Sequence, residues 1–328
     1  MYLGFMLSKK GQNIENITHK GNRSRGVQKQ ILKIIEHLGP YTFECALIYI
    51  QSLIRNSILY AAEAMYHIKE TDYRALERIE ESVLQKIFST KKSCSRHLMY
   101  LEAGMVPARY QIQRQVLNFL QYILQQPSNS LLYRVFEAMK MNPTKGDWTS
   151  FALNLVEKFE LKIIISEIKN MKRNQFKKLV KEKMLKIAFL ELQEKQQNGE
   201  KGRKIIYRSL SMADYLLPEA KLTVKEKTEI FSLRVEMNDN PCNFGMKILC
   251  DMGCQEIQYN SHIVNCPKLG NLNQQINLED ILNGSLPMTI EVLRRFEENI
   301  EKKNIHKQQQ EVPLWDSVTT VNPLYTTV

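Results

Sequence analysis

Apolar residues recur at three- and four-residue intervals along most of the chain, a pattern that predicts amphipathic helices. In the first half the pattern begins near Gly26, and it predicts helices over about 26–38, 42–68, 70–88, 95–103, 107–125 and 128–141. Gly39–Pro40 and Asn142–Pro143 interrupt the pattern, because proline cannot continue a helix. Ser8 to Arg25 is polar and contains several Gly and Asn residues, which predicts turns and loop.

The helical pattern resumes at Asp147 and runs through a basic second half. One apolar stripe in this half consists of Phe176, Leu179, Val180, Met184, Ile187 and Ala188. Further helices are predicted near 224–236, 278–282 and 288–302, and the residues from 307 onward predict a disordered tail. The opening segment YLGFML is short and β-prone. The chain is therefore predicted to be mainly α, with a short N-terminal β segment.

Composition agrees with helices and a sizeable core. Apolar residues make up 43% of the 328 residues and charged residues 25%, which excludes a long disordered chain. Gly and Pro are few, at 13 and 10, which argues against all-β and Gly-rich folds. At roughly 100–200 residues per domain, the length suggests about two domains.

Positive charge is concentrated in one stretch of the chain. Residues 160–208 hold fourteen Lys or Arg and six Glu, which is +8 of the net +11. The excess of positive charge favours a polyanionic partner, such as nucleic acid or an anionic membrane surface, without naming which. Nucleic acid would be bound through its phosphates. The predicted contacts are five basic side chains and one aromatic ring for base stacking: Lys177, Lys178, Lys181, Arg203, Lys204 and Tyr207. For each single lysine, a solvated helix face is the alternative interpretation.

The sequence predicts neither a membrane span nor a secretory leader. The apolar start, Tyr2 to Leu7, is shorter than a signal-peptide core and is followed directly by basic residues. The most apolar long window, Ala46 to Met65, contains Arg55 and Glu63, which predicts a core helix. Six cysteines are too few for a disulfide scaffold. We therefore expect an intracellular protein, in the nucleus or the cytoplasm, with reduced or metal-bound thiols.

The clearest chemical signal is the segment CDMGCQEIQYNSHIVNC, residues 250–266. Cys250, Cys254, His262 and Cys266 give the spacing C-x3-C-x7-H-x3-C. Three thiolates and one imidazole suit a structural, tetrahedral Zn²⁺ site. Cys242 is a rival ligand upstream of this segment. The alternative interpretation is a set of unrelated buried thiols and a surface histidine.

Signals for catalysis are absent from the sequence. It contains no phosphate-binding loop, dinucleotide fingerprint, zinc-protease helix motif or nucleophile elbow. No two of its seven Asp residues are adjacent, whereas a two-metal nucleotidyl-transfer site needs clustered carboxylates. His97 lies beside Arg96 and close to Cys94, a grouping that we interpret as polar residues at the start of a helix. No catalytic residue is predicted.

Four parts of the chain, taken in order, resemble the reverse transcriptases of LINE-type non-LTR retrotransposons, downstream of their catalytic centre. YLGFMLSKKG is similar to the strand that follows the palm's catalytic motif. ALERIEESVLQKIF and LEAGMVPARYQIQRQVLNFLQYIL resemble the thumb helices, with a Glu–Gly–Pro signature at Glu102, Gly104 and Pro107. EIFSLRVEMNDNPCNFG resembles the stretch before the terminal cysteine motif. Residues 250–266 are similar to the family's zinc knuckle, although the last gap is three residues where four is common.

The resemblance covers about residues 2–268 and implies a division into five regions. These are a palm-edge β remnant and loop (1–25), a thumb-like helical bundle (26–142), a basic helical connector (147–240), a CCHC zinc knuckle (241–270) and a helical tail ending in disorder (271–328). The family's catalytic aspartate pair lies upstream of the first region, so no catalytic residue carries over. The four zinc ligands do carry over. The resemblance further implies RNA or DNA contacts for the thumb, connector and knuckle.

Two functions from different classes remain open at this point. The first is a nucleic-acid-binding C-terminal fragment of a retrotransposon reverse transcriptase, inactive as a polymerase alone. The second is a helical interaction module, whose helices between 42 and 125 bind a separate polymerase (palm) chain. A decayed copy without a selected function is a third interpretation. Salt-sensitive binding to nucleic acid favours the first, and a complex that survives high salt favours the second.

Overall fold

The computed structural model describes residues 14–37, 43–66, 68–88, 94–144, 146–161, 165–199, 205 and 207–235. These residues belong to one compact unit, Met1–Asn238, and a second unit comprises Asp239–Val328. All regular elements of the described residues are helices, and their β pairing is limited to an isolated antiparallel bridge between Ala103 and Met212. The predicted mainly-α class is confirmed for this part of the chain. The predicted N-terminal β segment, zinc knuckle and C-terminal tail lie outside the described residues.

Short connections join most of the helices. In chain order they are α1 (Ile14–His37), α2 (Phe43–Tyr49), the π-helical η1 (Ile50–Ile54), α3 (Arg55–Leu59), η2 (Ala62–Ala64), α4 (Glu70–Ile87), α5 (Arg96–Glu102), α6 (Ala108–Leu124), α7 (Leu131–Met141), α8 (Trp148–Lys158), α9 (Ile165–Ile168), α10 (Arg173–Gln197), η4 (Asp214–Leu216), η5 (Pro218–Ala220) and α11 (Val224–Arg234).

Local sequence signals determine where several helices begin. Pro107 precedes α6, where its missing N–H is not needed for the helix ladder. Ser130 caps α7 by accepting a hydrogen bond from the Tyr133 backbone N–H at 3.2 Å. Asp147 caps α8 in the same way through the Ser150 N–H at 2.6 Å. The Asp147 cap explains why a helix resumes directly after the predicted break.

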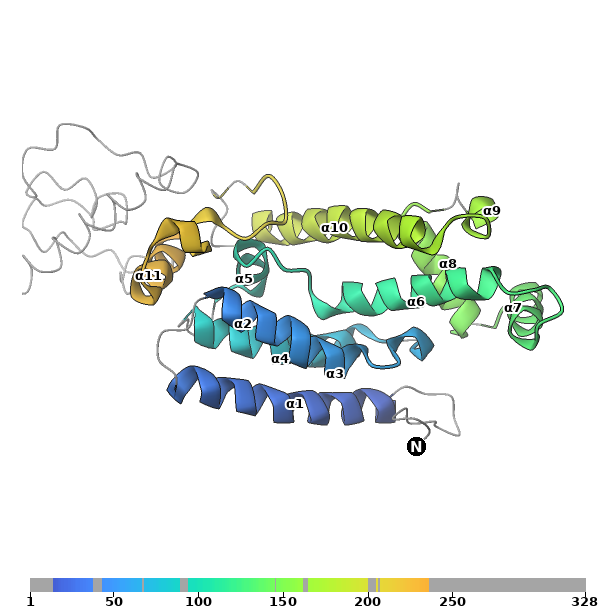
Figure 1. The fold of residues 1–328 in the computed structure, drawn as a ribbon, viewed down its shortest axis with the longest axis horizontal. Helices are drawn as coiled ribbons and strands as arrows, with labels where there is room; N and C mark the ends of the chain where they lie inside the picture. Colours follow the sequence, from blue (N-terminus) through green and yellow to red (C-terminus); the bar gives the residue numbers. More distant parts are fainter. Residues whose placement is uncertain are drawn as a thin grey trace, which may run out of the picture. The chain divides into compact units, whose positions relative to one another are not determined.

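Helices α1, α4, α6 and α10 pack in successive layers (Figure 1). α1 packs on α3 and α4, α4 packs on α6, and α10 packs on α6 and on α5. α6 buries Val116, Leu117 and Leu120 completely or almost completely. It is therefore the central helix of this unit.

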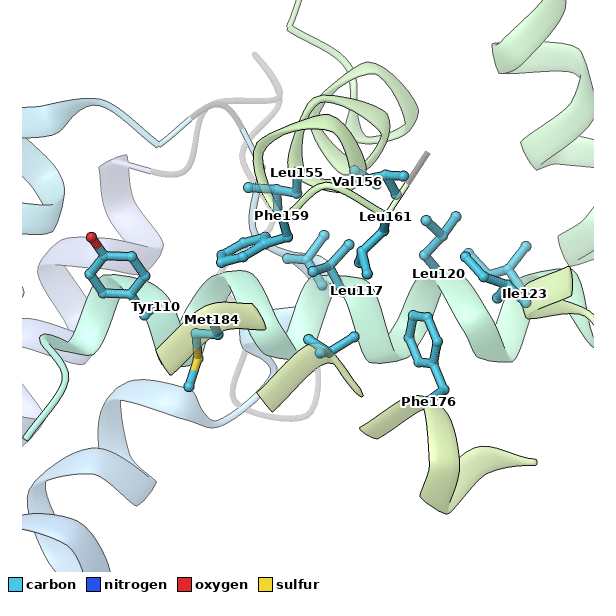
Figure 2. Packing of buried hydrophobic residues seen from close by; sticks show 14 of the residues in the cluster. Tyr110, Leu117, Leu120, Ile123, Leu155, Val156, Phe159, Leu161, Phe176 and Met184 are labelled. Atoms are coloured by element: carbon cyan, nitrogen blue, oxygen red, sulfur yellow. The ribbon is translucent and has the colours of Figure 1, made fainter. Parts of the chain in front are cut away.

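One hydrophobic cluster lies where α6 meets α8 and α10 (Figure 2). Its buried side chains include Leu117, Leu120, Val156, Phe159, Phe176 and Met184. Each large apolar side chain that is fully buried contributes about 1.5–3 kcal/mol relative to an exposed one. The cluster thus joins the helices before and after residues 142–147 into one compact unit.

The structure begins α1 at Ile14, whereas the sequence predicts loop up to residue 25. That prediction is wrong for residues 14–25, because α1 packs on its neighbours largely through polar side chains. Lys20 Nζ donates a hydrogen bond to the Ile58 carbonyl at 3.1 Å, and the Ser24 and Ser57 hydroxyls are paired. Polar contacts of this kind leave no apolar periodicity in the sequence.

The long helix predicted over 42–68 ends earlier, at the end of α3. The chain turns at Tyr60, and Ala61 adopts a left-handed conformation with φ +52°. Lys20 of α1 donates to the carbonyls of Ile58 and Tyr60, so it satisfies acceptors that the helix end leaves open. Burial lowers the pKa of Lys20 to about 8, while the charge of Glu63 acts in the opposite direction. A buried lysine thus caps this helix from another element.

A buried ion pair joins α3 to α4. Arg55 Nε lies 2.7 Å from Glu80 Oε1, and the Glu80 side chain is 0% exposed. The Tyr100 hydroxyl donates to Glu80 Oε2 at 3.2 Å, and Arg55 also donates to the Val106 carbonyl. These additional partners are what a charge pair needs in order to be tolerated in a core.

Candidate nucleic-acid interface

The buried side chains of α10 follow a strict four-residue repeat: Phe176, Val180, Met184, Ala188, Leu192 and Gln196. This row confirms the predicted apolar stripe, with Leu179 and Ile187 partly buried beside it. Four residues turn an α-helix by about 400°, so the row moves by roughly 40° around the axis at each step. Accordingly, the N-terminal part of α10 packs into the cluster with α6, and its C-terminal part lies beside α5.

Three predicted contact residues lie on the exposed side of α10: Lys177, Lys178 and Lys181. Within the described residues, no carboxylate pairs with Lys177 or Lys181, whereas Lys178 Nζ lies 4.0 Å from a carboxylate one turn away. Lys183 differs from these three, because its ammonium contacts the Glu160 carboxylate at 2.9 Å. The structure therefore presents a short lysine face, residues 177, 178 and 181, to solvent.

Tyr207, predicted to stack on a base, has its hydroxyl inside the protein. The hydroxyl bonds to the Glu102 carboxylate, which also accepts from Arg234 Nε at 2.9 Å. Burial and the charge of Glu102 raise the pKa of Tyr207, whereas Arg234 acts against that shift. The Tyr207 side chain is half-buried, and its hydroxyl makes a structural contact with Glu102. Base stacking by its ring stays a prediction.

The Glu–Gly–Pro signature has a structural explanation. Glu102 is 0% exposed, and its backbone carbonyl accepts from the Ala213 N–H at 2.9 Å. Gly104 has φ +61°, and a Cβ at this position would lie 2.2 Å from the Met212 nitrogen. Glycine is required on both counts. Glu102 and Gly104 thus hold the segment preceding η4 against the α5–α6 connection, and Pro107 stands at the start of α6.

The remaining predicted site residues lie outside the described residues: Arg203, Lys204, Cys250, Cys254, His262 and Cys266, together with the rival ligand Cys242. In the part of the chain that the structure describes, no three metal-ligating side chains come together. The donor set of the CCHC segment, three thiolates and one imidazole, matches the ligands of a structural zinc ion. The zinc site stays a prediction.

A polar pocket that the sequence does not predict lies where α5 meets α4, α6 and the C-terminal part of α10. We call it the basic pocket and define it by His97, four cations and two carboxylates: Arg74, Arg96, Arg109, Lys195, Glu77 and Glu191. Arg96 and His97 form the first turn of α5, after Ser95. Their interpretation as polar residues at a helix start is confirmed. The fold additionally places them beside Lys195.

Both carboxylates of the basic pocket are already paired. Glu77 accepts hydrogen bonds from Arg74 at 3.0 Å and from Arg109 at 2.8 Å. Glu191 lies 3.1 Å from the ammonium of Lys158, outside the pocket. Arg74 also pairs with Glu81 at 2.9 Å, and Arg109 pairs with Glu70 at 2.8 Å, so the positive charges of the two arginines are balanced within the protein.

The other two cations of the pocket, Arg96 and Lys195, have no carboxylate within salt-bridge distance among the described residues. Arg96 Nε donates to His97 Nε2 at 3.1 Å, which leaves the ring proton of a neutral His97 on Nδ1. Burial, followed by the charges of Arg96 and Lys195, lowers the pKa of His97 to about 4. At neutral pH the basic pocket thus combines a neutral imidazole with two cations that make no ion pair in the described residues.

The sequence gives little sign of this pocket, since its residues come from four helices. The one local signal is the Arg96–His97 pair, which resembles many polar helix starts. By contrast, the lysine face is visible in the sequence because all its members belong to one helix.

Comparisons with protein-family models, with curated proteins and with solved structures found no match to this chain. The resemblance to LINE-type reverse transcriptases therefore rests on the sequence segments quoted above. Across the helices that the structure describes, none is long and apolar enough to cross a membrane.

Proposed function

We propose that this chain is a nucleic-acid-binding, C-terminal part of a LINE-type non-LTR retrotransposon reverse transcriptase. The family in this proposal comes from the sequence resemblance, and the observation that carries nucleic-acid binding is the lysine face of α10. Lys177 and Lys181 lie one helical turn apart without a carboxylate partner in the described residues, and Lys178 lies beside them. Ammonium groups arranged in this way suit the phosphates of RNA or DNA, with little preference for base sequence.

The CCHC segment supports the same proposal. Cys250, Cys254, His262 and Cys266 would hold one Zn²⁺ that contributes folding energy rather than catalysis. A zinc knuckle would add a second contact to single-stranded nucleic acid. No two Asp residues of this sequence are adjacent, so we propose no polymerase activity for the chain by itself. Primer extension with Mg²⁺ or Mn²⁺ should yield no product above a buffer blank.

Binding of labelled single-stranded RNA at several salt concentrations tests the proposal. Each neutralised phosphate contributes roughly −0.7 to the slope of log K against log [salt] for single strands. The triple variant Lys177→Gln, Lys178→Gln, Lys181→Gln should bind more weakly, with a slope shallower by roughly 2 if all three lysines make contact. Unchanged affinity and slope, with helix content intact by circular dichroism, would show that the lysine face is only solvated.

A matched control removes the same charge elsewhere. Lys140, Lys221 and Lys225 are exposed and lie outside α10. Their triple Gln variant should retain most of the affinity, because scattered charges act on the strand only at long range. Equal losses in the two triple variants would assign the effect to net charge and not to the lysine face.

A protein-interaction module is a second candidate, favoured by the exposed apolar side chains of α7, which follows the helices between 42 and 125 that the sequence predicts for this role. Leu131 and Met141 are 78% and 76% exposed, and Val135 is also exposed. Apolar side chains gathered on a surface are typical of partner-binding sites. If this candidate is right, a complex with a separate palm chain should survive about 1 M salt, which screens ionic contacts strongly. It should dissociate when Leu131 and Val135 are changed to Ser.

A further inference from the structure

The basic pocket offers an anion site apart from the lysine face. Its carboxylates are already held by Arg74, Arg109 and Lys158. In the described residues Arg96 and Lys195 therefore have no carboxylate within salt-bridge distance, although Glu77 and Glu191 act on them electrostatically at longer range. These two residues belong to α5 and α10, helices that pack against each other. Two positive charges that a fold places close together repel each other, and a bound anion would relieve this repulsion.

We propose that the basic pocket binds a phosphate group. Arg96 retains its terminal guanidinium nitrogens as donors, because only its Nε is used by His97. Lys195 adds an ammonium, and the neutral His97 ring adds an N–H at Nδ1. A guanidinium fork, a point charge and a ring N–H together match the several acceptor oxygens of a tetrahedral phosphate.

The phosphate has two candidate sources with the same chemistry. One is a small molecule, such as inorganic phosphate or a nucleotide, and the other is the backbone of a nucleic-acid strand. α10 rises about 1.5 Å per residue, so Lys195 lies roughly 21 Å along the axis from Lys181. A strand that contacts both lysines must therefore extend over several nucleotides, whereas a small molecule fills the pocket alone.

The first experiment titrates inorganic phosphate into the full chain by calorimetry, against sodium chloride at equal ionic strength. We expect saturable binding of phosphate. Arg96→Gln and Lys195→Gln should each weaken it at least about tenfold, because each removes a charge-assisted contact. Lys195 is exposed, so its variant should fold even where the partly buried Arg96 variant does not.

Lys186→Gln is the matched control, since Lys186 is exposed on the same helix and does not line the basic pocket. It should bind phosphate like the unmodified chain. The proposal is overturned if the unmodified chain shows no saturable binding. It is equally overturned if Lys186→Gln loses as much affinity as Lys195→Gln.

A second experiment assigns the source by measuring single-stranded RNA binding to Lys195→Gln. If this variant weakens RNA binding as well as phosphate binding, a strand phosphate occupies the basic pocket. If only inorganic phosphate binds more weakly, the ligand is a small molecule. Either result supports the pocket independently of the proposed function, because Lys177, Lys178 and Lys181 are intact in this variant.

Discussion

Gly104 shows how a single residue determines the path of the backbone between α5 and α6. Its φ is +61°, and a methyl group there would lie within 2.4 Å of the backbone of Ser211 and Met212. Gly104→Ala should therefore destabilise the protein by about 3 kcal/mol, from left-handed strain together with overpacking. Urea unfolding followed by circular dichroism measures the change.

Gly26 provides the control for this substitution. It lies inside α1 and is exposed, and a methyl group added there would have no other atom within 4 Å. Gly26→Ala should stabilise the chain by up to about 1 kcal/mol, because Ala is the better helix former. If Gly104→Ala is as stable as Gly26→Ala, the close approach to the segment before η4 does not exist.

His97 gives the chain a defined response to acid. Burial and the charges of Arg96, Lys195, Arg74 and Arg109 lower its pKa to about 4, from 6.5. The unfolded chain then binds a proton more readily than the folded chain between these two values, so the folded state loses stability as the pH falls from 6.5 to about 4. His97→Gln should lose less stability over this window. Unfolding curves of both proteins at several pH values check this, and equal pH dependence would contradict it.

At the scale of elements, the Arg55–Glu80 pair fastens α3 to α4. Both side chains are buried, so removing one partner leaves an uncompensated charge or an unsatisfied acceptor. Arg55→Met should cost about 3–5 kcal/mol in the free energy of unfolding. Adding Glu80→Leu to that variant should recover part of the loss, since the stranded carboxylate is removed as well. A double-mutant cycle by denaturant unfolding measures this coupling, and purely additive losses would show that the pair is not coupled.

The elements that the sequence predicts well are those whose burial is apolar. α6 and α10 are predicted from regularly spaced residues such as Val116, Leu120 and Phe176, all of which are buried. The sequence does not predict the first half of α1, because Lys20 and Ser24 pack it against α3 through hydrogen bonds, whereas other helices pack through apolar side chains. The end of α3 is missed for the same reason, since its capping group comes from a residue distant in the chain.

The sequence predicts one of the two candidate anion-binding surfaces and not the other. The lysine face follows from helical spacing alone, because Lys177 and Lys181 share one side of one helix. The basic pocket does not, because Arg96 and Lys195 meet only after α5 and α10 have packed. A local sequence pattern predicts only the residues that one helix presents. The pocket depends on the packing of four helices and on the ion pairs that Arg74 and Arg109 make with carboxylates.

At the scale of the whole molecule, charge and core are organised on the same helix. α10 contributes Phe176, Val180 and Met184 to the cluster with α6 and α8. The same helix carries the lysine face near its start and Lys195 of the basic pocket near its end. The lysines that we propose to bind anions are thus fixed to both ends of one core helix, which holds them at a constant separation.

The purified chain should contain about one Zn²⁺, bound by Cys250, Cys254, His262 and Cys266, because compact thiolate–imidazole sets of this kind bind zinc tightly. The double variant Cys250→Ser, Cys254→Ser should lose most of the zinc, measured by elemental analysis after dialysis.

Two further variants make this measurement specific. Cys45 lies in α2, away from the CCHC segment in sequence, so Cys45→Ser should keep the full zinc content. Cys242→Ser tests whether the rival ligand Cys242 binds the metal. Zinc should be retained in this variant if His262 and the cysteines 250, 254 and 266 are the ligands. Loss of zinc in Cys242→Ser, with retention in the Cys250 and Cys254 double variant, would assign the ion to a different set of thiolates. Since a structural zinc site couples binding to folding, a chelator should unfold the segment around these ligands and leave the helices of the first unit intact.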